Sequence, residues 1–154
     1  ESGVTDIEVK TTLRDPPIAR INDIQQLEYS EGKELLLAVV QLSKERSGDS
    51  LPDFINKSRE YIKKQSQRTE GFEELIKTLG YLDKHELYYT SRYNVSNILF
   101  CPIEEDTPIL DSELLGIIPS TVSDIAYSLH ISGLKRKTPD ENDWNLLKDK
   151  MLGN

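Results

Sequence analysis

The stretch that decides the predicted fold is Leu35-Leu36-Leu37-Ala38-Val39-Val40, which is apolar at every position. Ser30 precedes it in the role of a helix N-cap, and the polar residues 47–50 follow it as a loop. The sequence therefore predicts one helix of about sixteen residues between them. A helix that is apolar on all sides has to be surrounded by other elements. We expect this helix to lie at the centre of the core.

Further helices are predicted on the C-terminal side of this one. Ser50 and Asp53 have the spacing of a capping box and start a second helix. The apolar residues expected on its inward face are Phe54, Ile55, Tyr61 and Ile62. A third helix runs from about Glu70 to a stop at Gly80. The stretch Thr138-Pro139-Asp140-Glu141 predicts a last helix, because a Thr cap, an early proline and acidic residues all suit a helix N-terminus.

Two regions depart from the helical pattern. Residues 1–16 alternate weakly between polar and apolar, which predicts an extended or flexible N-terminal arm, either loose or paired at a sheet edge. Residues 86–90 and 94–103 are rich in Tyr, Val, Ile and Phe, which predicts a small two-stranded hairpin. The predicted fold class is therefore mainly α. A single compact helical domain of five to seven helices, with this hairpin, covers residues 17–154.

The composition limits the compartment and the partners. The chain of 154 residues has a formal net charge of −8, which disfavours non-specific attraction to nucleic acid or to anionic lipid. Its single cysteine, Cys101, excludes an internal disulfide framework and fits a reducing compartment. The longest apolar stretch is far too short to span a bilayer. We therefore predict an intracellular protein, cytoplasmic or nuclear, that has no membrane partner.

No catalytic or metal-binding pattern is recognised in the sequence. His85 and His130 lie in different predicted elements, and neither has a carboxylate at helical spacing. There is no GxSxG or HExxH motif, no phosphate-binding glycine loop and no pair of cysteines. We therefore predict no catalytic residue, no metal and no cofactor, and a chain that is not an enzyme. The one enzymatic alternative is a pair of Cys101 and a histidine that folding brings together.

The leading prediction of function is a non-enzymatic protein–protein interaction module, such as an adaptor, scaffold or regulatory domain of a larger assembly. Lys57, Lys64 and Arg68 recur at i, i+7 and i+11, so they share one helix face that suits an acidic segment of a partner protein. The alternative is a solvated helix surface. Trp144 is either the anchor of a contact with another protein or a part of the domain's own core.

A second class of function rests on residues 114–126, LLGIIPSTVSDIA. This segment is similar to the helix-turn-helix of bacterial repressors, in which a short helix and a turn lead into a second helix. The resemblance implies a nucleic-acid-binding helix-turn-helix or winged-helix-like domain within residues 112–137. The residues that would contact nucleic acid are Ser120, Thr121, Lys135, Arg136 and Lys137. Two capped helices that pack into the core are the alternative, because the second helix presents Asp124 rather than basic groups.

The basic run Lys135-Arg136-Lys137 has two further interpretations. It is either a short nuclear-import patch or a solvated linker into the last helix. Three basic residues do not separate these alternatives.

Overall fold

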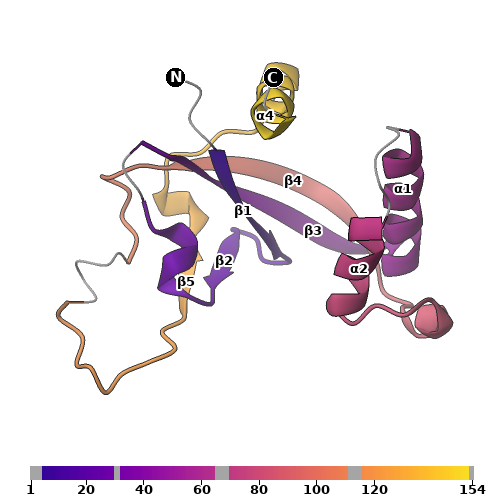
Figure 1. The fold of residues 1–154 in the computed structure, drawn as a ribbon, viewed down its shortest axis with the longest axis horizontal. Helices are drawn as coiled ribbons and strands as arrows, with labels where there is room; N and C mark the ends of the chain where they lie inside the picture. The colour runs from indigo at the N-terminus through magenta and orange to yellow at the C-terminus, as the bar shows by residue number, and fades with distance from the viewer. Residues whose placement is uncertain (1–4, 30–31, 65–69, 111–115, 153–154) are drawn as a thin grey trace. The chain divides into compact units, whose positions relative to one another are not determined.

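A computed structural model describes residues 5–29, 32–64, 70–110 and 116–152, which form an α+β fold (Figure 1). The chain divides into two compact units. We call the first, Glu1–Leu42 with Val95–Asn154, the sheet unit, and the second, Ser43–Asn94, the helical unit. The predicted mainly α class is wrong, because strands build most of the sheet unit.

The sheet unit is built on two sheets. β1 (Thr5–Thr12), β3 (Glu34–Ser50) and β4 (Arg92–Ile103) form a three-stranded sheet in the order β1-β3-β4. β1 runs parallel to β3, and β4 returns in the opposite direction (Figure 1). β2 (Ile18–Ile21) and β5 (Tyr127–His130) pair as a second, antiparallel sheet. Both β3 and β4 continue into the helical unit.

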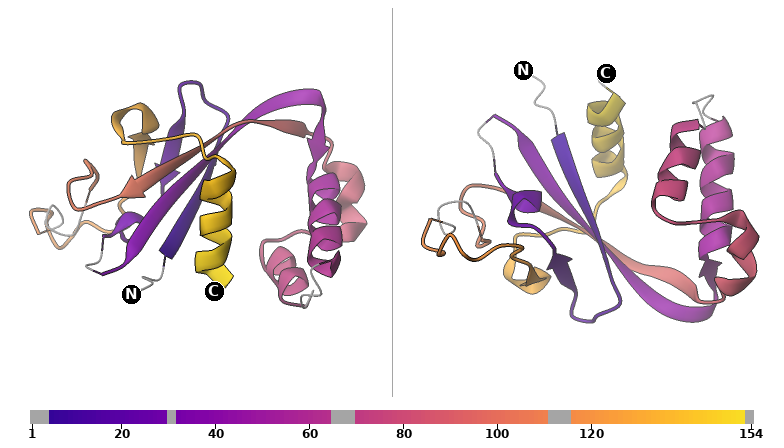
Figure 2. Two further views of the ribbon diagram at one scale, coloured as in Figure 1. Left: turned by 90° about the horizontal axis from the view of Figure 1, so that it is seen from above. Right: turned by 60° about the horizontal axis from the view of Figure 1, so that its bottom comes forward.

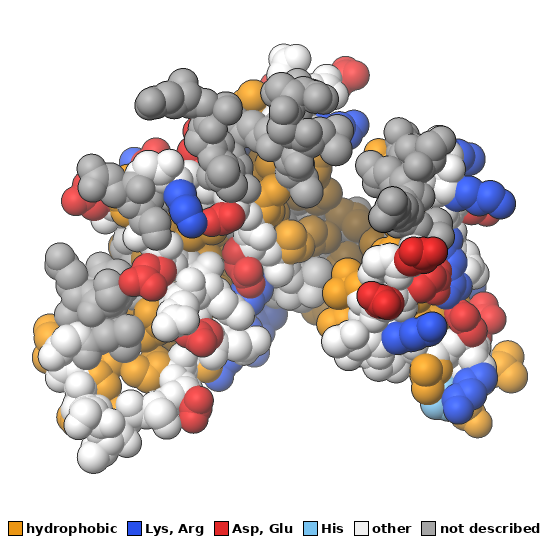
Figure 3. All heavy atoms as spheres, in the orientation of Figure 1, with side chains coloured by type: hydrophobic (Ala, Val, Ile, Leu, Met, Phe, Trp, Pro, Cys, Tyr) orange, Lys and Arg blue, Asp and Glu red, His pale blue; other side chains and the backbone are white. Residues whose placement is uncertain are grey.

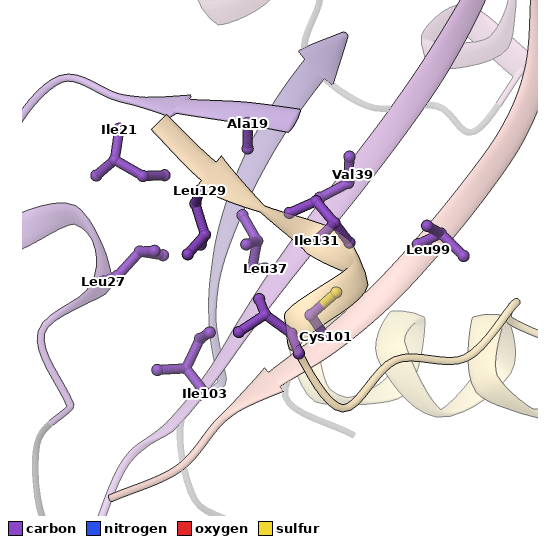
Figure 4. Close-up of a cluster of buried hydrophobic side chains, with 11 residues drawn as sticks. Ala19, Ile21, Leu27, Leu37, Val39, Leu99, Cys101, Ile103, Leu129 and Ile131 are labelled. Carbon is purple, nitrogen blue, oxygen red and sulfur yellow. The ribbon is translucent and has the colours of Figure 1, made fainter. Parts of the chain in front are cut away.

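The main core lies between these two sheets. Its buried side chains come from all the strands except β1, from the 3-10 helices η1 (Ile24–Leu27) and η3 (Ile131–Gly133), and from the residue that follows η3 (Figure 4). They are Ala19, Ile21, Leu27, Leu37, Val39, Leu99, Cys101, Ile103, Leu129, Ile131 and Leu134. The helix α4 (Glu141–Leu152) lies on the other face of the three-stranded sheet (Figures 1 and 2). There the ring of Trp144 meets Phe100 edge-on, with 5.0 Å between ring centroids.

The helical unit contains α1 (Leu51–Lys64), α2 (Glu70–Thr78) and the 3-10 helix η2 (Asp83–Tyr88). Its buried cluster is formed by Ile55 of α1, Ile76 of α2 and Tyr81. The capping box predicted before α1 is confirmed. The backbone N–H and the hydroxyl of Ser50 donate to Asp53 Oδ2 at 2.9 and 2.7 Å, and Asp53 N donates to Ser50 Oγ at 3.3 Å. Gly80, with a φ of 86°, follows the end of α2 as predicted.

The central helix predicted after Ser30 is wrong, because residues 35–40 belong to strand β3. Alternate residues of a strand face opposite sides, so Leu37 and Val39 enter the main core while Leu36 lies on the α4 side with Phe100. A strand that is covered on both faces is apolar at every position. Such a run has the same appearance in sequence as a buried helix of equal length.

Two other predicted elements are also wrong. The hairpin near residues 86–103 is instead η2 followed by the single long strand β4, whose partner is β3. The two short helices of the predicted helix-turn-helix are also absent from the described residues. Residues 111–115, where the first would begin, lie outside the described part of the chain. Residues 116–126 form turns and irregular structure, and residues 127–130 form β5. The helix-turn-helix prediction therefore fails over the residues that the structure describes.

The first described element of the chain is the strand β1, and the last is the helix α4. Residues 5–12 pair at the sheet edge as β1, so the paired alternative describes this part of the arm. The last helix is confirmed, although its cap is Asp140 and not Thr138. Asp143 N donates to Asp140 Oδ1 at 2.9 Å, and Asp140 N donates to Asp143 Oδ2 at 3.1 Å. Among the described residues no helix is long and apolar enough to cross a membrane.

Gly48 lies where β3 passes very close to β4. A Cβ atom added to Gly48 would be 2.4 Å from the carbonyl carbon of Tyr93 and 2.8 Å from its nitrogen. We expect Gly48→Ala to destabilise the protein by about 1–3 kcal/mol in urea unfolding, because backbone has to move to relieve the overlap. Gly71→Ala is the control, since no atom lies within 4 Å of its added Cβ. A Gly48→Ala variant as stable as the control would contradict this account of the crossing.

An ion-pair network joins the helices of the helical unit. Arg59 donates to both carboxylate oxygens of Glu73, at 2.8 and 2.9 Å, and pairs with Asp83 at 3.1 Å. The hydrogen bonds from Arg59 hold the pKa of Glu73 below its ordinary value. A lowered carboxylate pKa adds stability above the unfolded-state pKa, and this stability is lost as pH falls through the folded-state pKa.

We therefore expect the urea midpoint to decrease on acidification from about pH 7 to about pH 3, and Glu73→Gln to remove part of that decrease. The effect is small, because the carboxylate is one third exposed. Glu74→Gln, at the exposed neighbouring position, is the control and should keep the full decrease. Identical pH profiles for the two variants would show that the Arg59 network does not contribute to stability.

Candidate active site on strand β1

Strand β1 turns its charged side chains inward and a valine outward. Glu8 lies level with Leu37 of β3, and Lys10 lies level with Val39, so both charged residues share the face that holds the main core. The Lys10 side chain is only 13% exposed and the Glu8 side chain 27%. Val9, on the other face, is 58% exposed. This is the reverse of the ordinary distribution of charged and apolar groups, and it identifies β1 as a candidate functional element.

The inward side chains contact one another and a residue of η1. Lys10 Nζ lies 2.6 Å from Glu8 Oε1 and donates to Gln26 Oε1 at 2.7 Å. Gln26 Oε1 also accepts a hydrogen bond from the backbone N–H of Asn22 at 3.2 Å. We call these three side chains the Glu8–Lys10–Gln26 cluster. A lysine ammonium has three N–H donors, so within the described part of the chain one of them has no acceptor.

The oxygen ligands near the cluster fit a sparsely coordinated magnesium ion. The described residues contain no group of three or more His, Cys, Asp or Glu that could hold a metal. Glu8 provides one carboxylate, and Asp6 provides a second on the same strand face, two residues earlier. Magnesium is commonly bound by one or two carboxylates, with water and substrate phosphate as its other ligands. Glu8 and Asp6 match that arrangement and do not match a site made wholly of protein ligands.

The residues predicted for partner binding are found on both units. On α1, Lys57 forms an ion pair with Asp49 at 2.6 Å, and Lys64 is exposed. Arg68 lies outside the described residues. Trp144 belongs to the sheet unit, where it packs on Phe100 and keeps 36% of its surface exposed. The structure does not bring Trp144 together with the α1 lysines in one unit.

The inward face predicted for α1 is only partly correct. Ile55 is buried and Ile62 is half-buried, as predicted. Phe54 and Tyr61 are instead exposed, at 61% and 57%.

The basic residues predicted for nucleic-acid binding already have partners within the sheet unit. Lys135 Nζ pairs with Glu104 at 2.6 Å, and Lys137 pairs with Asp143. Arg136 Nη1 donates to the carbonyl oxygen of Ser132 at 2.8 Å, which stabilises the chain next to η3. Ser120 and Thr121 are exposed in an irregular segment and not on a helix. These five residues do not form a recognition surface of the predicted kind.

Cys101 does not serve as the nucleophile of the enzymatic alternative. It is fully buried in the main core, and burial raises the pKa of its thiol to about 11. Only the thiolate form is a strong nucleophile. The residue therefore fills space in the core.

Comparison with models of protein families places the chain in a described family. Residues 3–132 match the family DUF4420, whose description is "Putative PD-(D/E)XK family member". No curated protein and no solved structure matches the chain. The description itself contains a sequence pattern, an acidic residue and a lysine separated by one residue.

Two triplets of the chain fit this pattern, Glu8-Val9-Lys10 and Glu31-Gly32-Lys33. The first lies on β1, and the second begins at a residue outside the described part of the chain. Pro-Asp, the other half of the pattern, occurs at Pro52-Asp53 and Pro139-Asp140. Both aspartates take part in capping hydrogen bonds at helix N-termini.

Sequence reasoning missed Glu8, Lys10 and Gln26. The signal available for the first two was a strand-like alternation in which one residue separates an acidic residue from a lysine. Side chains at i and i+2 of a strand point to the same face, which is why this spacing brings a carboxylate and an ammonium group together. Gln26 had no comparable signal, because its contact with Lys10 depends on the tertiary fold.

Proposed function

The chain belongs to the DUF4420 family, and on that premise we propose that it is a nuclease with Glu8 and Lys10 in its active site. Proteins of the PD-(D/E)XK superfamily are typically nucleases and other phosphodiesterases. The observation that carries the proposal is the inward placement of both charged side chains of Glu8-Val9-Lys10 on β1. The family match overturns two predictions, the non-enzymatic adaptor, scaffold or regulatory module and the absence of enzymatic activity.

Lys10 is placed to stabilise negative charge on a phosphodiester. Phosphoryl transfer spreads charge over the oxygens of the reacting phosphate, and fixed positive groups act on that charge most strongly where water is excluded. The side chain of Lys10 is largely shielded from water. Two of its three N–H groups serve Glu8 and Gln26, and among the described residues the third has no acceptor, so it can donate to a phosphate oxygen.

Glu8 is placed to hold a divalent cation, with Asp6 as a second ligand on the same face. Bound there, the cation would supply Lewis-acid stabilisation of the phosphoryl oxygens and would lower the pKa of a bound water. Lys10 contacts Oε1 of Glu8 and fixes the orientation of that carboxylate. Oε2 has no hydrogen-bond partner among the described side chains, so it is available as a ligand.

The acidic net charge of the chain is unevenly divided between the two units. The helical unit, Ser43–Asn94, carries ten basic and nine acidic residues, a net charge of +1, which leaves −9 for the rest of the chain. Figure 3 shows Lys and Arg side chains over the α1 side of this unit. Contact with phosphate at the candidate site therefore depends on a local group, Lys10, and not on the net charge of either unit, because charges beyond about 8–10 Å are screened at physiological salt.

The test is a cleavage assay with the full chain. Duplex DNA, single-stranded DNA and RNA are incubated with the protein in magnesium or manganese, with EDTA as the metal-free control. We expect strand cleavage of at least one substrate that requires the divalent cation and that is lost in Glu8→Gln. A wild-type protein that cleaves none of the three, or a Glu8→Gln variant as active as the wild type, would refute the proposal.

A further inference from the structure

The position of the Lys10 ammonium group depends on a second acceptor outside its own strand. A lysine side chain has several rotatable bonds and loses conformational entropy when it is fixed. Glu8 alone fixes it from the same strand, through the 2.6 Å contact. Gln26 approaches from η1 and accepts at 2.7 Å, so two separate elements hold the same nitrogen.

The amide of Gln26 is itself held in place. Its Oε1 accepts from both Lys10 Nζ and Asn22 N. Because both neighbours are donors, the hydrogen-bond network requires the oxygen, and not the nitrogen, on this side of the amide. The turn that carries it is anchored, since Ile24 and Leu27 are both buried and Leu27 belongs to the main core (Figure 4). Asp23 caps the turn by accepting from Gln25 N at 2.9 Å.

A neutral acceptor suits this position better than a charged one. A carboxylate would compete with a phosphate for the ammonium group and would partly cancel its charge. An amide oxygen orients the group and leaves its charge for the substrate. If a cation on Glu8 were to weaken the interaction of Glu8 with Lys10, the contact from Gln26 would still hold the nitrogen.

We propose that Gln26 is a positioning residue that fixes the ammonium group of Lys10 for transition-state stabilisation, an inference that rests on the proposed function of Lys10. Groups that orient an active-site residue typically change activity by about 10–100-fold when they are removed. Gln26→Met keeps the length of the side chain and removes the acceptor. We therefore expect its kcat for nucleic-acid cleavage to fall by about 10–100-fold with KM within about twofold of the wild type.

The chain offers a matched control one residue away. Gln25 is in the same turn, but its side chain is exposed and makes no hydrogen bond to any residue that the structure describes. Gln25→Met should leave kcat, KM and the thermal melt unchanged. Gln26→Glu restores an acceptor, so we expect it to hold the ammonium group again while regaining only part of kcat, because its charge competes with phosphate.

A second measurement is independent of activity. Nitrogen-15 relaxation of the Lys10 NH₃⁺ group in the full chain reports how tightly this group is held. We expect a high order parameter in the wild type, in Gln25→Met and in Gln26→Glu, and a clearly lower one in Gln26→Met. If Gln26→Met does not fold, Gln26→Ala provides the same comparison without adding an apolar side chain.

The outcomes separate the two proposals. If Lys10 is as ordered in the folded Gln26→Met or Gln26→Ala variant as in the wild type, the positioning role is refuted. It is also refuted if Lys10 loses order while kcat of an active enzyme stays at the wild-type value. If the wild type cleaves nothing and Lys10 still loses order only in Gln26→Met or Gln26→Ala, the contact stands and the proposed function fails.

Discussion

Lys10→Met is expected to lower kcat for cleavage by roughly 10²–10³-fold, the typical cost of removing one group that stabilises transition-state charge. Methionine keeps most of the length and the apolar stem of lysine and removes only the ammonium group. The loss should appear in kcat rather than in KM, because the charge that Lys10 meets develops during the reaction. Single-turnover cleavage at saturating protein measures this step directly.

The other Glu-x-Lys triplet provides the control for this experiment. Lys33 stands in the same sequence pattern as Lys10, but it lies exposed immediately before β3. Lys33→Met should therefore cleave at the wild-type rate. If both variants lose activity together, the loss reflects general electrostatic attraction of the substrate. If neither variant loses activity, Lys10 is not in the active site.

Val39→Asp is expected to abolish cooperative unfolding. Val39 is fully buried in the main core, on the central strand of the three-stranded sheet. Burying a carboxylate without a partner costs several kcal/mol or more. That cost is comparable with the total stability of a domain, about 5–15 kcal/mol. Circular dichroism during heating should show a broad or absent transition.

Val9→Asp is the matched control, because it introduces the same change on the adjacent strand of the same sheet. Val9 is 58% exposed, so its carboxylate stays hydrated and the melt should remain cooperative. A cooperative melt of Val39→Asp near the wild-type temperature would contradict the assignment of β3 to the core. Equal damage from both variants would mean that the outer face of β1 is covered.

The sequence by itself determined the parts of the fold that depend on neighbouring residues. The start of α1 follows from the hydrogen bonds between Ser50 and Asp53, three positions apart, and a capping box shows this spacing directly. The last helix likewise begins beside the predicted cluster of proline and acidic residues, with Asp140 as its cap. Such signals can be recognised before the fold is known, because every group involved lies within one turn of the chain.

Only the tertiary structure decided that residues 35–40 are a strand. An apolar run of this length satisfies a buried helix and a buried strand equally well. The choice depends on the backbone partners, and those are β1 and β4, which are remote from β3 in sequence. Hydrogen bonds to such remote strands leave no local pattern in the run itself.

The candidate site combines both kinds of information. The spacing of Glu8 and Lys10 is present in the sequence and guarantees that the two side chains share a face of any strand. Which face that is depends on the parallel register that sets Glu8 beside Leu37 and Lys10 beside Val39. Gln26 reaches Lys10 because buried Leu27 fixes η1 in the core next to β1. A contact between residues sixteen positions apart requires the whole unit to fold, so only the tertiary structure could place the third member of the cluster.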